Sequence, residues 1–155
     1  MVATQHHVAT EAGAAMLSSG GNAVDAAVAA AFTLGVVEPA ASGLGGQTVM
    51  LLHLGEHGRT FCLDGGSRAP HRTPPGQLGR EEQLRGHKAT TVPSTPAVLA
   101  WALQRYGTKS LEEVLEPAIK AAATGYRVSP LQHSLADRGL RYLKEFSGGK
   151  LFLEG

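Results

Sequence analysis

Few residues of this 155-residue chain have the types and spacing that catalysis requires. His6 and His7 are adjacent, so on a helix they would point in different directions and make a poor pair of metal ligands. Thr90 and Thr91 carry hydroxyl groups that could act as nucleophiles, but no base lies at a supporting spacing. The residues alone therefore predict no catalytic group, no metal site and no cofactor in the chain.

The single cysteine, Cys62, lies between Phe61 and Leu63 in an apolar run. One cysteine cannot form an internal disulfide bond. A cysteine with apolar neighbours is typical of a small buried side chain rather than of a reactive thiolate. We therefore expect Cys62 to be buried.

The segment Gly43–Gly46 is rich in glycine and precedes a strand-like run. A dinucleotide-binding loop leaves a strand and enters a helix, so this segment predicts a flexible loop or close backbone packing instead. The charged residues Arg80, Glu81, Glu82 and Arg85 are typical of a solvated surface.

Composition excludes some classes of protein. Lys and Arg number 14 and Asp and Glu 13, which argues against a nucleic-acid partner. The most apolar run, Ala26–Val37, is shorter than the roughly 20 residues of a membrane span. No signal peptide is readable at the start, so the sequence as written predicts a soluble, cytoplasmic protein without a membrane partner. A leader missing upstream would allow export.

Two helices are expected in the first forty residues. Val8–Leu17 is rich in alanine and is followed by the glycine pair Gly20–Gly21, which is typical of a helix end. Asn22 is a good N-cap for the next helix. Ala26–Val37 has Thr33 as its one polar side chain, and a helix that is apolar on every side must be central to a larger core.

A β-hairpin is expected next, from Thr48–Leu54 and Thr60–Asp64 joined by the loop Gly55–Gly58. Both runs are almost continuously apolar, which predicts burial on both faces. A layered arrangement of helices and strands fits this order. Residues from about 65 to 90 are rich in Pro, Gly and charge and predict a long surface loop.

The part from about 95 to 145 is expected to be helical. Thr95 can cap a helix that ends at Tyr106, and Ser110–Glu113 is a capping-box pattern. Pro117 is expected to break the helix, so that a short turn is followed by a second helix that reaches Thr124. A last helix is expected from Ser129–Pro130 to about Leu143.

Four stretches of the chain resemble the γ-glutamyltranspeptidase family of N-terminal nucleophile hydrolases. Gly20–Ala29 reads GGNAVDAAVA, which is nearly identical to the signature of that family. Pro39–Gly46, Asp64–Pro70 and Tyr106–Gly125 follow in the family's order and spacing. Four motifs in order, covering Met1 to about Pro130, make the resemblance specific.

The resemblance implies an α+β fold, the αββα sandwich. Residues 1–155 would be the amino-terminal segment of a large subunit, contributing a helical layer and a hairpin of the central sheet. The family is made as a zymogen that cuts itself, and the new amino-terminal Thr of the small subunit attacks an amide carbonyl with its own α-amine as base. That Thr and the oxyanion-stabilising glycines would lie downstream of Gly155. The implied partners are the remainder of the precursor and a small amide substrate, as in glutathione metabolism.

One substrate-binding position of the family falls inside the chain. In transpeptidases an Arg four residues before the Pro of an Ala-Pro pair binds the α-carboxylate of the γ-glutamyl group. Counting back from Pro70 places Gly66 there, while Arg68 lies two residues later and on the same side of an extended segment. This form resembles divergent γ-glutamyltranspeptidase-like amidohydrolases. The hypothesis is that Arg68 contacts an anionic substrate group; the alternative is that Arg68 pairs with Asp64 or with a helix C-terminus.

Ser94, where many members carry Gly, is a milder departure. Two functions remain open on the sequence. The chain is a segment of an enzyme that hydrolyses or transfers the acyl group of small acidic amides, or it is a non-catalytic fragment or degenerate paralogue that only binds or has no independent role.

Overall fold

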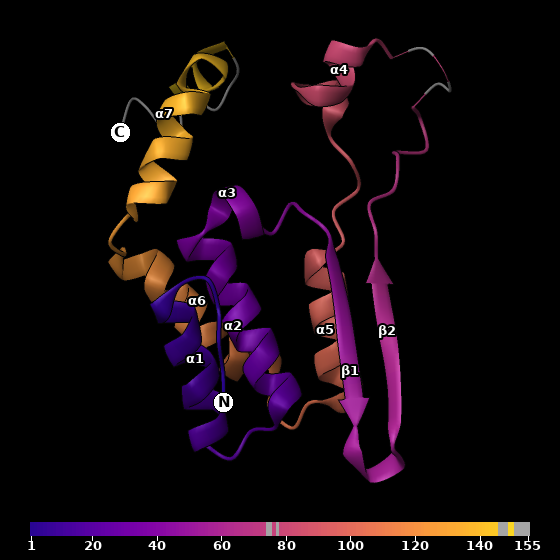
Figure 1. The fold of residues 1–155 in the computed structure, drawn as a ribbon, viewed down its shortest axis with the longest axis vertical. Helices are drawn as coiled ribbons and strands as arrows, with labels where there is room; N and C mark the ends of the chain where they lie inside the picture. The colour runs from indigo at the N-terminus through magenta and orange to yellow at the C-terminus, as the bar shows by residue number, and fades with distance from the viewer. Residues whose placement is uncertain (74–75, 77, 146–148, 151–155) are drawn as a thin grey trace. The chain divides into compact units, whose positions relative to one another are not determined.

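The computed structural model describes residues 1–73, 76, 78–145 and 149–150. The chain forms two units, residues 1–68 with 92–126 and residues 69–91 with 127–155. The first unit is built from these elements (Figure 1): α1 His7–Ser18, α2 Ala23–Val37, α3 Pro39–Ser42, β1 Thr48–Leu54, η1 Gly55–His57, β2 Arg59–Gly65, α5 Thr95–Tyr106 and α6 Leu111–Thr124. The second holds α4 Arg80–Leu84, η2 His87–Ala89 and α7 Pro130–Glu145.

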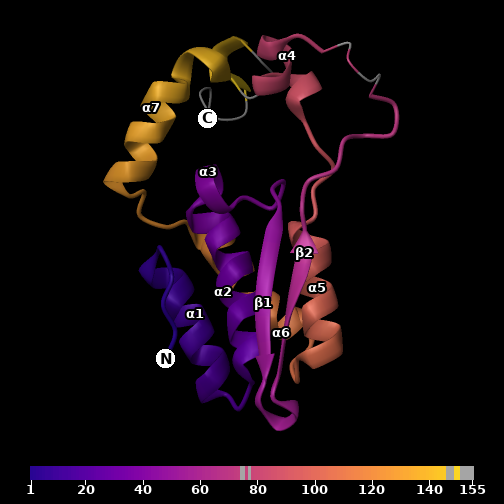
Figure 2. The ribbon, with the colours of Figure 1, turned by 45° about the vertical axis from the view of Figure 1, so that its right-hand side comes forward.

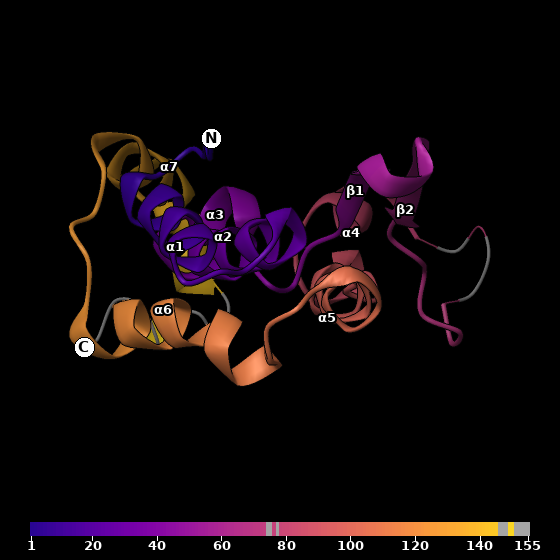
Figure 3. The same ribbon diagram turned by 90° about the horizontal axis from the view of Figure 1, so that it is seen from below.

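The turn between α1 and α2 is confirmed in detail. Gly20 adopts φ 84°, a conformation that glycine reaches without steric cost, and its N–H donates to the Leu17 carbonyl. The Gly21 N–H donates to the Met16 carbonyl, which completes a Schellman motif. The Asn22 side chain then accepts from the N–H groups at the start of α2. These local hydrogen bonds explain why α1 and α2 lie side by side (Figure 3).

Helix α2 is central to the first unit, as predicted, because it packs against α1, α5 and α6. Its covered side chains join one core cluster: Met16, Ala26, Val28, Ala29, Phe32, Leu99, Leu103, Val114 and Ala118. A narrow strip is less covered, since Ala23 and Ala27 are exposed. Small side chains along α2 allow its neighbours to approach closely, and Gly13 of α1 lies against the Ala26 carbonyl.

The hairpin has the predicted strands in antiparallel register, with Leu51 opposite Cys62. Leu52 is buried on the face that contacts α5, which lies along the hairpin in Figure 2. The other face is open: Val49 is 64% and Leu51 is 74% exposed, and Cys62 is exposed too. The predictions of two-sided burial and of a buried Cys62 are therefore wrong for the described chain. Successive side chains of a strand alternate between faces, and only one face has a helix against it here.

The open apolar face of the hairpin affects the solubility that we expect of the chain when it is expressed by itself. We expect it to be poorly soluble or partly unfolded, because a two-stranded sheet with one uncovered apolar face is marginal in water. The double substitution Val49→Thr, Leu51→Thr places polar β-branched residues at both positions and is expected to raise the soluble yield several-fold. The matched change His53→Thr on the same face should not. A sharp, cooperative thermal transition of the unmodified chain by circular dichroism would contradict the prediction.

Helix α5 ends at Tyr106 as expected, but its cap differs by one residue. Ser94 is the N-cap position, and Thr95 is not the cap. The Thr95 hydroxyl oxygen instead accepts a hydrogen bond from the Thr48 hydroxyl at 2.9 Å. The side chain predicted to cap the helix thus makes a tertiary contact with β1.

Helix α6 confirms the capping box of Ser110 and Glu113 but not the predicted break at Pro117. The helix runs through the proline without interruption to Thr124. The proline removes one backbone bond, to the carbonyl of Glu113, and Glu113 is exposed so that water can replace the lost donor. Burial of Val114, Ala118 and Ala121 on one face holds the two halves in line.

In the second unit, α7 begins at Pro130 as predicted, with the Gln132 N–H donating to the Ser129 hydroxyl oxygen at 3.1 Å. The segment expected as a surface loop, 65–90, also contains α4 and η2. Composition did not indicate α4, whose first turn is closed by Glu82 accepting from the Gly79 N–H at 2.9 Å. No helix in the described part of the chain is long and apolar enough to cross a membrane.

Candidate functional site

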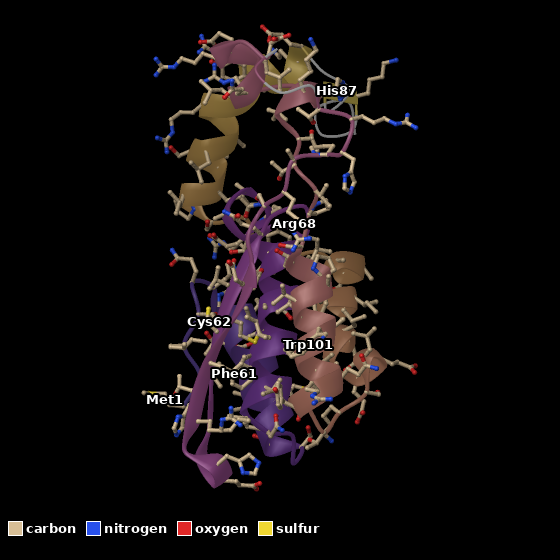
Figure 4. The ribbon with its side chains drawn as sticks, turned by 90° about the vertical axis from the view of Figure 1, so that its right-hand side faces the viewer. Met1, Phe61, Cys62, Arg68, His87 and Trp101 are labelled. Carbon is tan, nitrogen blue, oxygen red and sulfur yellow. The ribbon has the colours of Figure 1, made fainter. Side chains whose placement is uncertain are left out.

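Three segments meet at the end of the hairpin opposite the η1 turn. We call them together the loop junction: residues 46–48 before and in β1, 65–68 at the end of β2, and 92–95 before and at the start of α5. The Ser94 N–H donates to the Gly46 carbonyl at 3.0 Å, and the Val92 N–H donates to the Arg68 carbonyl at 2.9 Å. The Ser94 hydroxyl also donates to the Gly65 carbonyl. Figure 4 shows Arg68 at this end of the hairpin.

Gly65 lets the three segments approach one another. A Cβ at this position would lie 2.4 Å from Val98 Cγ2 and 2.6 Å from the Thr48 carbonyl oxygen, distances that no side chain tolerates. Gly43 is similar, since its Cβ would lie 2.6 Å from the Pro39 carbonyl oxygen. Gly65 and Gly43 thus serve close backbone packing, which is one of the two interpretations of Gly43–Gly46, whereas a Cβ at Gly45 would meet no atom within 4 Å.

Arg68, the predicted substrate-binding residue, has a fixed backbone and an uncommitted side chain. Its carbonyl bridges to Val92, as in a short antiparallel pair. Its side chain is exposed, and no hydrogen bond or ion pair joins its guanidinium to the described residues. The Asp64 carboxylate accepts from the Gly66 N–H at 2.8 Å instead. The alternative ion pair between Arg68 and Asp64 is therefore not formed.

Gln47 is a junction residue that sequence reasoning missed. Its side-chain oxygen accepts from the Ser67 N–H at 2.8 Å and from the Ser67 hydroxyl at 2.9 Å. A single glutamine before a strand carries no pattern, so no signal in the chain could have indicated it. Beside it lies a cavity of about 540 Å³, lined by the end of α2, α3, the glycine-rich loop and Thr95.

The other candidates of the sequence do not form sites. His6 is buried and its Nδ1 accepts from the Val8 N–H at 3.3 Å, so His6 is the N-cap of α1. Thr90 and Thr91 are exposed. Among the described residues no group of His, Cys, Asp or Glu could hold a metal ion. In the predicted charged surface, Lys88 pairs with Glu82 at 2.5 Å.

Asp25, in the signature motif, is a buried carboxylate with a structural role. It is 0% exposed and lies at the start of α2. Its oxygens accept from the Asn22 N–H at 2.7 Å, the Thr108 N–H at 2.9 Å and the Lys109 N–H at 3.1 Å. The Thr108 hydroxyl donates at 2.7 Å. The motif thus joins α2 to the connection between α5 and α6 rather than to the junction.

Helices packed on one face of an antiparallel hairpin, with a glycine-rich loop leading into the first strand, define an α+β layered protein. The profile of the γ-glutamyltranspeptidase family matches residues 9–154, and the chain belongs to this family. Its fold class is accordingly that of the αββα N-terminal nucleophile hydrolases, as the resemblance implied.

Relatives with two kinds of name match about equally well. The glutathione hydrolase proenzyme of Bacillus subtilis strain 168 is 38% identical over 146 residues, which cover 88% of this chain and 25% of that protein. The acylase ACY 1 proenzyme of Pseudomonas sp. strain SE83 is 39% identical over 145 residues, covering 84% of this chain and 25% of that protein. The chain is thus as similar to a relative named as a glutathione hydrolase as to one named as an acylase.

Solved structures of similar proteins have the same fold as this chain. The crystal structure of Helicobacter pylori γ-glutamyltranspeptidase superposes with a TM-score of 0.93 at 33% identity, covering 98% of this chain and 45% of that chain. The cephalosporin acylase of Bacillus halodurans superposes with a TM-score of 0.76 at 32% identity, covering 90% of this chain and 27% of that chain. This chain thus spans about a quarter of the length of the proenzymes it matches.

Proposed function

We propose that this chain is the amino-terminal segment of the large subunit of a γ-glutamyltranspeptidase-like enzyme. The enzyme hydrolyses or transfers the acyl group of γ-glutamyl or related small acidic amides through a Thr nucleophile located outside this chain. In this proposal the chain contributes scaffold and a substrate-binding group, and its partner is the remainder of the precursor. Relatives that are named proenzymes and are about four times as long support it.

The observation that carries the proposed substrate class is the free guanidinium of Arg68. None of the described carboxylates lies within 4.0 Å of it, so its charge is available to a ligand. The amino-terminal end of α5 follows Val92, the backbone partner of Arg68, by three residues, and a helix start carries partial positive charge. Both features favour an anionic group of the substrate. A planar guanidinium binds a carboxylate through two charge-assisted hydrogen bonds.

The open face of the hairpin is a surface that the remainder of the precursor would cover. Val49 and Leu51 form an apolar patch on the open face of the hairpin, and the edges of a two-stranded sheet have unpaired backbone groups. We propose that further strands of the precursor pair with and cover this hairpin. In the completed sandwich the loop junction would be an edge at which substrate is bound.

Substitution of Arg68 tests the function. In the enzyme that contains this chain, Arg68→Ala is expected to raise KM for a γ-glutamyl anilide about 10- to 100-fold and to change kcat little, because one charge-assisted contact in the ground state is lost. The analogue with a carboxamide in place of the α-carboxylate should show no such rise. Arg59→Ala, at the other end of β2, is the matched control. An unchanged KM for Arg68→Ala would remove the proposed role of Arg68.

The second candidate is that the chain is a non-catalytic fragment or degenerate paralogue. A gene that continues past Gly155 into a Thr-initiated small subunit supports the enzyme, and a stop codon there supports the fragment.

A further inference from the structure

We infer that Gln47 is a positioning residue that aims Arg68 at its anionic ligand. The inference rests on the proposed function of Arg68 as a substrate-binding residue. It assigns a positioning role to a glutamine whose side chain is hydrogen-bonded to Ser67. Gln47 acts through Ser67, the neighbour of Arg68 in the chain.

The segment that carries Arg68 has left the sheet but is still held at each residue. Strand β2 ends at Gly65, so the ladder with β1 no longer fixes residues 66–68. The Gly66 N–H donates to Asp64, the Ser67 N–H donates to Gln47, and the Arg68 carbonyl accepts from Val92. Ordering a loop residue costs backbone conformational entropy, and three consecutive backbone contacts to three partners offset that cost and favour one conformation.

Gln47 supplies the part of this framework that reaches across the junction. It lies directly before β1, 20 residues from Ser67, and one side-chain oxygen takes both the N–H and the hydroxyl of Ser67. Two donors on one oxygen fix the position of Ser67 and the orientation of its side chain. The direction in which the next residue, Arg68, leaves the backbone is then set before a ligand arrives.

The type of side chain at position 47 also affects the charge around the Arg68 guanidinium. An amide oxygen accepts both bonds without carrying a formal charge, so it leaves the Arg68 guanidinium unneutralised. A glutamate there would accept the same bonds more strongly but would put a negative charge near the guanidinium and compete with an anionic ligand. A neutral acceptor is therefore the arrangement that both orders the loop and keeps the site cationic.

A double-substitution cycle tests the inference in the enzyme that contains this chain. With a γ-glutamyl anilide as probe, Gln47→Ala is expected to raise KM about 5- to 10-fold and to leave kcat within about twofold. In an Arg68→Ala background, Gln47→Ala should raise KM no further, because there is no guanidinium left to aim. An equal rise in both backgrounds would overturn the inference, since Gln47 would then act on the fold at large.

Two further variants cover the case in which Gln47→Ala does not fold. Gln47→Glu keeps the acceptor and is expected to raise KM for the γ-glutamyl anilide but not for its carboxamide analogue, which lacks the α-carboxylate. Ser67→Ala removes one of the two bonds and should raise KM about two- to threefold. If Arg68→Ala raises KM while both of these variants leave it unchanged, the inference about Gln47 is wrong and the proposed function stands. If Arg68→Ala itself leaves KM unchanged, the role of Arg68 in the proposed function fails first.

Discussion

Replacing Asp25 by Ala is expected to lower the free energy of unfolding by about 3–4 kcal/mol, the largest loss we expect from one side chain. The substitution leaves the backbone N–H groups of Asn22, Thr108 and Lys109 without their shared acceptor at a part-buried site. Hydrogen bonds to a charged group are stronger than neutral ones, and donors that lose their partner away from full solvent add a desolvation penalty. Folded domains are stable by only about 5–15 kcal/mol, so this loss would be severe.

The measurement is the urea midpoint of the protein that contains this chain, followed by circular dichroism. Asp137→Ala is the matched control, because it removes an exposed Asp from α7 and should shift the midpoint little. Thr108→Val, which removes one of the four donors, should fall between the two. A midpoint for Asp25→Ala equal to that of Asp137→Ala would show that the buried carboxylate is not a stabilising centre.

The same residue predicts how stability depends on pH. Burial by itself raises the pKa of Asp25, but the hydrogen bonds from the Thr108 hydroxyl and from the Asn22, Lys109 and Thr108 N–H groups outweigh burial and hold the pKa below its ordinary value of 3.8. A carboxyl group with a lowered pKa contributes its full stabilisation above the ordinary value and loses it as pH falls through the folded-state pKa. The difference in midpoint between the unmodified protein and Asp25→Ala should therefore be full at neutral pH and narrow below pH 3.8.

Gly65→Ala is expected to be the next most damaging change, with a loss of about 2–3 kcal/mol and a raised KM in the enzyme. The new Cβ would lie 2.6 Å from the Thr48 carbonyl oxygen, in the partner strand of the hairpin, and 2.4 Å from Val98 Cγ2 in α5. The Thr48 carbonyl belongs to β1, which cannot shift without breaking its pairing with β2. The overlap is therefore transmitted to the loop junction and to Arg68.

Gly55→Ala is the control for this substitution, because its Cβ would meet no atom within 4 Å. Thermal unfolding and the KM for a γ-glutamyl anilide should both change in Gly65→Ala, and neither should change in Gly55→Ala. Equal behaviour of the two variants would mean that the junction yields easily and that its close packing does not hold Arg68 in place.

Much of this protein follows from short stretches of its sequence. The Gly20–Gly21 helix end, the Asn22 cap and the capping box of Ser110 depend on hydrogen bonds between residues a few positions apart, and the two strands of the hairpin are joined by a short turn. Such features are predictable because the partners are neighbours along the chain. The order of four motifs indicates the family, and with it the prediction that Arg68 binds the substrate.

The remaining features were decided only when distant segments met. Asp25 is hydrogen-bonded to Thr108, which lies 83 residues away, and Gln47 to Ser67, which lies 20 residues away. No local pattern in the sequence predicts either pair. Pro117 stays within α6 because tertiary burial of one helix face outweighs one missing backbone bond. The two strands have apolar side chains on both faces of the hairpin, because successive side chains alternate between faces. Which face is buried is decided by packing against α5, which the sequence of the strands does not indicate.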